Sequence, residues 1–188
     1  MNFHPIKHFC TITKHRHAVI RHAAKAGILF QGLRHDLSKY SPTEFWIGAC
    51  NYLGSRSPND RERKNKGYST AWLHHKGRNK HHFEYWTDYN PETHMLSPIE
   101  MPYKYFVEMI CDRIAASKTY QGDKYSPQHP IEYFMKAKKV RFIHPVTSLK
   151  LEYILTMLAE KGEDETFKFL REHKNGFDVP KDFKEREV

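Results

Sequence analysis

Residues 32–39 read Gly-Leu-Arg-His-Asp-Leu-Ser-Lys, and the rest of the chain is organised around the pair His35–Asp36 inside this stretch. A histidine beside an aspartate offers a metal ion one imidazole nitrogen and one carboxylate oxygen from a single point of the backbone. Hard and borderline divalent cations accept both ligand types. Taken alone, such a pair is more often a capped helix or a surface pair, so its meaning depends on the remaining sequence.

Further histidines supply the context that the pair needs. The chain has 14 histidines, and they concentrate in residues 1–35 and 74–82. Asp112 lies on an apolar stripe of an expected helix, where a carboxylate is costly unless something pairs with it. Together these residues give the order His…His-Asp…His…His…Asp. The candidate ligands, segment by segment, are His15, His17 or His22; His35 and Asp36; His74 or His75; His81 or His82; and Asp112.

Helix start and stop signals predict an all-α, single-domain helical bundle, which can bring ligands together from the inward faces of several helices. The clearest long helix is expected over residues 102–120, where apolar side chains recur at helical spacing. Ser41–Pro42–Thr43–Glu44 is a capping box with proline at the first helical position, and residues 97–100 repeat that pattern. No alternating strand pattern of useful length is present. Other helices are expected over residues 13–26, 33–40, 68–75, 80–88, 131–140, 145–161 and 163–173, with loops at 54–66 and 90–97.

Composition and charge limit the classes of function. The formal net charge is +9, from 31 Lys plus Arg against 22 Asp plus Glu, which favours an anionic partner such as a phosphorylated small molecule, a nucleotide or nucleic acid. A mean hydropathy of -0.79 and the lack of a long apolar run argue against a membrane protein. Three dispersed cysteines and an N-terminus without an apolar signal region lead us to expect a reducing cytoplasm. No phosphate-binding glycine loop, nucleophile elbow or His-Glu-x-x-His motif is present.

Several blocks of sequence carry a resemblance to a known family. They are Lys14–His15, the stretch HDLSKYSPTEF at residues 35–45, Trp72-Leu73-His74-His75, Arg78-Asn79-Lys80-His81-His82, Tyr85–Trp86 and Glu108-Met109-Ile110-Cys111-Asp112. Together they resemble the HD-domain superfamily of metal-dependent phosphohydrolases, whose motif is His…His-Asp…Asp, and more locally a bacterial and phage family within it. The two additional histidines resemble its dinuclear branch. We therefore expect an HD-like domain over residues 1–188, with the core motif at 11–121, accessory helices at 122–178 and a charged tail at 179–188.

The resemblance also implies a ligand set. His15, His35, Asp36 and Asp112 would bind the first metal ion, and His75 and His82 would complete a second, with Asp36 bridging the two. His17 or His22 could replace His15. His74 and His81 have the same seven-residue spacing as His75 and His82, so spacing does not choose between the pairs. Iron, manganese, zinc or magnesium would suit these ligands.

The implied activity is hydrolysis of a phosphomonoester or phosphodiester, with a nucleotide as one substrate class. His35, Asp36 and Lys39 would form the catalytic group. Lys39, Arg78 and Lys118 are the cations that we expect to contact the phosphate. Two other functions fit the sequence: a diiron oxygenase of the same superfamily, and a basic nucleic-acid-binding protein with a vestigial metal site, for which the net charge and the basic residues 61–66 speak.

Overall fold

The computed structural model describes residues 3–185 and is mainly α-helical, as the sequence predicts. A two-stranded antiparallel hairpin, β1 (Thr87–Asn90) and β2 (Met95–Pro98), interrupts the helices. Short 3₁₀ turns join the larger elements: η1 (Leu37–Tyr40), η2 (Phe83–Tyr85), η3 (Gly122–Lys124) and η4 (Lys138–Val140). The helices are α1 (Pro5–Lys25), α2 (Leu29–Leu33), α3 (Pro42–Cys50), α4 (Pro58–Lys66), α5 (Thr70–Lys76), α6 (Tyr103–Gln121), α7 (His129–Met135) and α8 (Pro145–Glu172).

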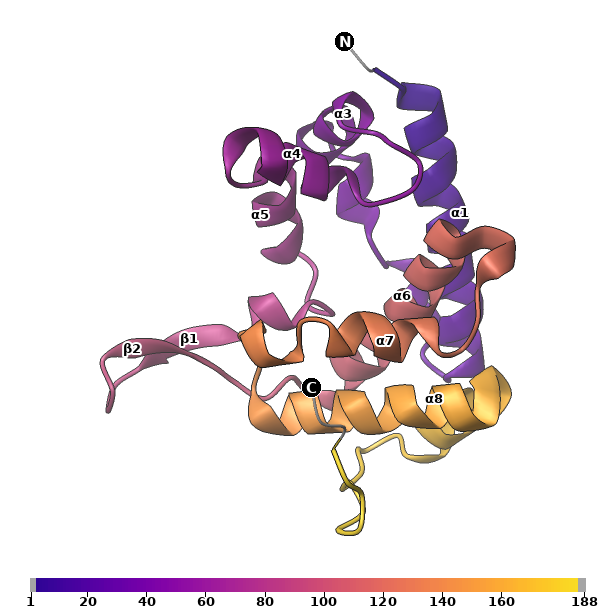
Figure 1. The fold of residues 1–188 in the computed structure, drawn as a ribbon, viewed down its shortest axis with the longest axis vertical. Coiled ribbons are helices and arrows are strands. Elements are labelled where there is room, and N and C mark those ends of the chain that lie inside the picture. Colours follow the sequence, from indigo (N-terminus) through magenta and orange to yellow (C-terminus); the bar gives the residue numbers. More distant parts are fainter. Residues whose placement is uncertain (1–2, 186–188) are drawn as a thin grey trace.

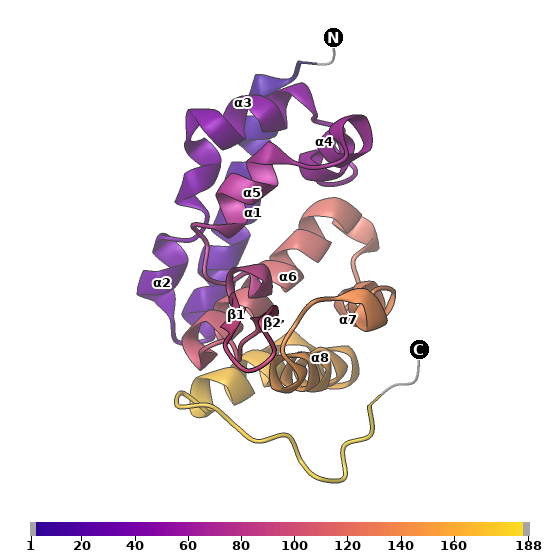
Figure 2. The same ribbon diagram turned by 90° about the vertical axis from the view of Figure 1, so that its left-hand side faces the viewer.

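The helices form two groups that share α1 (Figure 1). The helices α3, α4 and α5 gather beside the N-terminal half of α1, whereas α6, α7 and α8 lie at its other end. A quarter turn of the view keeps this division, with α2 against α1 between the two groups (Figure 2). The hairpin projects from the side of the molecule (Figure 1). No helix within residues 3–185 is long and apolar enough to cross a membrane.

Different interactions stabilise the interiors of the two helix groups. Apolar side chains such as Val19, Ile110, Phe134 and Leu155 fill the space between α1, α6, α7 and α8 and are fully buried. Around α3, α4 and α5 the buried side chains are mostly polar; they include Glu44, Glu62, Ser69 and His75. Burial of polar groups is stable only when they are paired, so this half of the fold depends on directed contacts.

The stretch at 54–66, predicted as a surface loop, contains helix α4 instead. Its start is capped by Ser57, whose hydroxyl accepts a hydrogen bond from the backbone N–H of Asn59, and it ends at Gly67 with φ 83°. The prediction was wrong because the segment carries almost no apolar residues. What holds the helix is Glu62, which is buried and accepts hydrogen bonds from the hydroxyls of Ser69 and Thr70, each at 2.7 Å.

The hairpin corrects two further predictions. Only residues 91–94 of the loop expected at 90–97 are a turn; the rest belongs to the hairpin, in which β2 pairs with β1 with Thr87 opposite Pro98 and Asn90 opposite Met95. Residues 97–100 do not start a helix either, since α6 begins at Tyr103. Both strands have four residues, none of which is buried, so their sequences lack the alternation that a half-buried strand shows.

Several helix boundaries also differ from the predictions. Proline at its first position lets α1 begin at Pro5, well before residue 13. Of the helix expected over residues 33–40, only η1 and Leu33, the last residue of α2, are helical; a turn at residues 34–36, with Asp36 left-handed, separates them. Residues 80–88 do not form an α-helix: a turn leads into the 3₁₀ turn η2, and β1 begins at Thr87. The two helices expected at the C-terminus are continuous as α8 except at Gly162, where φ is 79°; part of the charged tail, residues 186–188, lies outside the described range.

We expect Gly32→Ala to destabilise the fold by about 1–3 kcal/mol, because a Cβ there would lie 2.4 Å from the Cβ of Ala23 on α1. Gly77→Ala is the matched control: its nearest neighbour is the carbonyl oxygen of Leu73 at 3.4 Å, and its φ of -73° suits any residue. Urea unfolding of the two variants measures the difference. Equal stability would show that α2 does not need its close approach to α1.

Glu62 predicts a pH-dependent stability. Burial raises the pKa of its carboxyl, but hydrogen bonds from Ser69 and Thr70 outweigh burial and bring the pKa to about 2 from 4.5. Since the folded pKa is depressed, the stabilisation is present above about pH 4.5 and is lost as the pH falls towards 2. The difference in unfolding free energy between wild type and Glu62→Gln should change by about 2–3 kcal/mol over that range. Asp60→Asn, at an exposed neighbour, should keep the wild-type pH profile; a constant gap for Glu62→Gln would contradict the interpretation.

Candidate metal centre

The site is built on the turn between α2 and η1. Asp36 has φ 54° and ψ 25°, a left-handed conformation that few residues other than glycine adopt, although aspartate tolerates it better than most. This turn places the side chains of His35 and Asp36 on the same side of the chain, with His35 Nε2 3.2 Å from Asp36 Oδ2. Both side chains are almost fully buried. The backbone strain is typical of a functional site.

Two further residues complete a first group of possible metal ligands. His15 comes from α1 and Asp112 from α6, and the distance from His15 Nε2 to Asp112 Oδ1 is 3.0 Å. His35 Nε2 lies 3.7 Å from the same oxygen, and His15 Nε2 lies 3.8 Å from Asp36 Oδ2. One ligand atom from each of the four residues lies within 4.8 Å of the others. The group can therefore enclose one cation.

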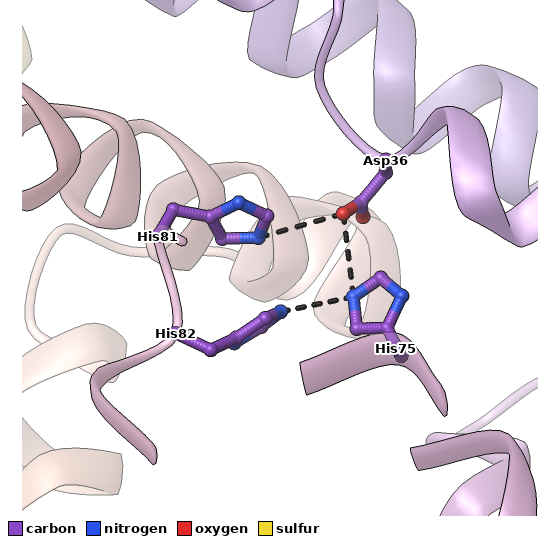
Figure 3. Close-up of side chains that lie close together, drawn as sticks. All are labelled: Asp36, His75, His81 and His82. Carbon is purple, nitrogen blue, oxygen red and sulfur yellow. Dashed lines mark hydrogen bonds and ion pairs between the residues drawn. The ribbon is translucent and has the colours of Figure 1, made fainter. Parts of the chain in front are cut away.

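A second group meets the other oxygen of Asp36 (Figure 3). His75, on α5, places Nε2 3.3 Å from Asp36 Oδ1, and His81 places Nε2 3.4 Å from the same atom. The Nε2 atoms of His75 and His82 are 2.9 Å apart. These four side chains point towards one another and form a second set of ligand atoms within 4.8 Å. Asp36 belongs to both groups, so it can bridge two cations.

Two glutamates outside these groups orient the imidazole rings. The Nδ1–H of His35 donates to Glu108 Oε1 at 2.8 Å, and His81 Nδ1 lies 3.2 Å from the same oxygen. The Nδ1–H of His75 donates to Glu44 Oε2 at 2.7 Å. A histidine that donates from Nδ1 keeps the lone pair on Nε2, which is the usual arrangement of metal-binding histidines. The Nε2 atoms are the ones that face Asp36.

Opposing charges keep the buried carboxylates ionised. Burial raises the pKa of Asp36, but His35 and Lys39 outweigh it and hold that pKa well below its usual range. Burial and Lys39 lower the pKa of His15, whereas the charge of Asp36 overcomes burial and raises the pKa of His35. Burial likewise raises the pKa of Glu108, yet hydrogen bonds from the two histidines bring it to about 2. Without a metal ion, the site thus holds ionised carboxylates beside cationic side chains.

The buried polar atoms of the site are better suited to bind a metal ion than to form hydrogen bonds with one another. The Nε2 atoms of His15, His35 and His81 and Oδ1 of Asp36 are buried without a properly directed hydrogen bond, which native proteins rarely tolerate. All of them are lone-pair donors that suit divalent iron, manganese or zinc. Cys111 is buried but belongs to neither group, so no thiolate ligand contributes. The donor set therefore fits borderline divalent cations.

The structure separates most of the alternative histidines. His17 is exposed, and His22 is 3.1 Å from the carbonyl oxygen of Cys111 through its Nδ1 and stacks on Phe167, so His15 is the residue of α1 that joins the site. His74 contacts Glu44 at 2.7 Å from outside the two groups, which leaves His75 as the ligand candidate on α5. His81 and His82 both face Asp36 and His75, so both are ligand candidates.

Of the three expected phosphate contacts, one lies at the site. The ammonium group of Lys39 is 2.5 Å from Asp36 Oδ2. Arg78 is exposed and donates to the carbonyl oxygen of His74 at 3.3 Å. Lys118 pairs with Glu163 at 2.6 Å, because a residue six positions after Asp112 lies on another face of α6. The structure brings Lys39 to the ligands and leaves Arg78 and Lys118 outside both groups; their contact with substrate stays a prediction.

The roles of the two orienting glutamates were not predicted from the sequence. Glu108 precedes Asp112 by one helical turn and therefore shares its face, a signal that was available in the sequence. Glu44 was interpreted as part of a capping box, but Ser41 makes no side-chain capping bond and Glu44 contacts histidines instead. Ser38 and Asn79 were also missed; the Asn79 amide donates to the Ser38 hydroxyl at 2.8 Å beside His75.

Comparison with known proteins gives a family but no activity. A model described as a family of unknown function (DUF5662) matches residues 4–157. That range contains every residue of the two ligand groups and both orienting glutamates. No curated protein and no solved structure matches the chain. Because the match covers most of its length, the chain belongs to the DUF5662 family.

Proposed function

We propose that this protein is a metal-dependent phosphohydrolase of the HD type that works with two divalent ions. The observation that carries the proposal is the meeting of buried, unbonded Nε2 atoms around the two oxygens of Asp36. The ligands follow one another in the order that the HD-domain motif has, with Asp36 in the bridging position. The basic net charge of the chain favours an anionic substrate.

The proposed ligands come from five parts of the chain. The first ion would be held by His15, His35, Asp36 and Asp112, and the second by Asp36, His75, His81 and His82. His81 adds one imidazole to the set that the sequence resemblance implies. Iron, manganese or zinc suits this mixture of imidazole and carboxylate better than magnesium, which prefers oxygen ligands.

When bound, a pair of divalent ions supplies an activated water as nucleophile and positive charge for the phosphoryl oxygens. The protein's own side chains position the reactants. Asp36 sets the two ligand groups side by side, and Glu44 and Glu108 keep the imidazoles in one tautomer. Lys39 is the one lysine or arginine within residues 3–185 that pairs with a proposed ligand, so we assign its ammonium group to a non-bridging phosphate oxygen.

A direct test is hydrolysis of two generic substrates, p-nitrophenyl phosphate and bis(p-nitrophenyl) phosphate, by protein loaded with Mn²⁺. Chelator-sensitive release of nitrophenol from either one supports the proposal and separates a monoesterase from a diesterase. Oxygen consumption by iron-loaded protein without phosphoester cleavage would favour the diiron oxygenase. Salt-dependent binding of DNA or RNA that a chelator does not affect would favour a nucleic-acid-binding protein.

The number of metal ions bound per chain should depend on which ligand group a substitution alters. We expect two Mn²⁺ per chain in the wild type, none in Asp36→Asn, and one in either His15→Ala or His75→Ala, measured by elemental analysis after desalting. Asn is the suitable replacement because it tolerates the left-handed backbone of residue 36. His17→Ala, an exposed neighbour on α1, is the control and should keep two ions. Full metal content in Asp36→Asn would contradict a bridging role.

Lys39→Met should lower kcat/KM for the better phosphoester substrate by about 100-fold while leaving the metal content unchanged, since it removes a charge that acts on the phosphoryl group. Arg78→Met and Lys118→Met should have smaller effects, because both side chains lie outside the ligand groups. Steady-state kinetics of the three Mn²⁺-loaded variants measures this order. Equal losses in all three would show that overall charge, and not the position of Lys39, matters.

A further inference from the structure

We infer that Glu108 is a positioning residue for both ions at once, and that it links the occupancy of one ion to that of the other. The inference rests on the two-ion proposal above. Its basis is the Oε1 atom of Glu108, which faces the Nδ1 atoms of His35 and His81. His35 belongs to the first ligand group and His81 to the second.

The geometry makes Glu108 a shared acceptor. Its Oε1 is 2.8 Å from His35 Nδ1 and 3.2 Å from His81 Nδ1, and the two rings pack with their centroids 4.3 Å apart. Both rings then present Nε2 towards Asp36 from opposite groups, at 3.2 Å from Oδ2 and 3.4 Å from Oδ1. One carboxylate therefore sets the tautomer and the tilt of one ligand on each side of Asp36.

Glu108 is itself held in place. The side-chain amide of Gln31 donates to its Oε2 at 2.5 Å and also to the backbone carbonyl of Lys104, one turn earlier on α6. Both carboxylate oxygens are thus engaged, and the residue is buried. A rotation of Glu108 that suited one ring would displace the other, so a change at one ion position is passed to the second through a single side chain.

Glu44 provides the contrast within the same site. It also accepts hydrogen bonds from two rings, those of His74 and His75, at 2.7 Å each. Only His75 belongs to a ligand group, because His74 lies outside both. Loss of Glu44 should therefore weaken the second ion alone, whereas loss of Glu108 should weaken both.

The test measures Mn²⁺ affinity position by position. His15→Ala leaves the second ligand group intact, and His75→Ala leaves the first, so each background reports one ion by calorimetric titration with Mn²⁺ alone. Glu108→Leu, which removes both acceptors at similar size, should weaken binding by about 10–100-fold in both backgrounds. Glu44→Leu should do so only in the His15→Ala background. Glu108→Gln keeps a neutral acceptor and should restore part of the affinity in both.

A second readout reports the tautomers directly. Histidine ¹⁵N chemical shifts of the diamagnetic Zn²⁺-loaded protein should show protonated Nδ1 in His35 and His81, and the shifts of both rings should change together in Glu108→Gln. Thermal unfolding of this near-isosteric variant identifies any loss of fold. If Glu108→Gln and Glu108→Leu weaken only one ion, the link is wrong while the two-ion centre stands. If folded wild type binds no Mn²⁺, the proposed function fails as well.

Discussion

The buried carboxylate of Asp36 is the constraint on which the rest of the site depends. An ionised aspartate removed from water costs several kcal/mol unless charges and hydrogen-bond donors surround it. Here the surroundings come from separate parts of the chain, since His15, His75 and His81 approach from α1, from α5 and from the segment before η2. The backbone turn that bears Asp36 follows α2, which packs closely on α1 at Gly32. A local backbone feature thereby determines where three distant segments meet.

This arrangement ties the candidate metal centre to the less apolar half of the fold. The helices α6, α7 and α8 share an apolar core with α1, whereas α3, α4 and α5 bury Glu44, Glu62 and His75 instead. Polar contacts of this kind specify one geometry but add little net free energy. Ions that bind only the folded chain would stabilise it according to their affinity and concentration. The second ligand group lies between α5 and the turn at Asp36, so that stabilisation would act where the apolar core is absent.

Sequence reasoning succeeded where one local signal was sufficient. The apolar stripe predicted α6, proline at the first helical position predicted the start of α3, and Gly162 separates two helical segments as expected. It failed where the local structure depends on a contact with a residue distant in sequence. The helix α4 depends on Glu62 reaching Ser69 and Thr70, which composition cannot reveal. Likewise, equal spacing left His74 and His75 equivalent, and both rings contact Glu44. Only the approach of His75 Nε2 to Asp36 Oδ1, at 3.3 Å, shows which ring faces the site.

The order of the ligands along the chain and their meeting in space are separate observations. A sequence can carry histidines and aspartates in the HD-type order by descent or by chance, and that order alone does not oblige their side chains to converge. Conversely, buried imidazoles can gather for packing reasons, but packing does not require three Nε2 atoms to remain without directed hydrogen bonds. Nor does it require carboxylates behind the rings that set their tautomers, as Glu108 and Glu44 do. These outer carboxylates favour cation binding over a merely structural cluster, because their effect is to keep a lone pair on each inward-facing nitrogen.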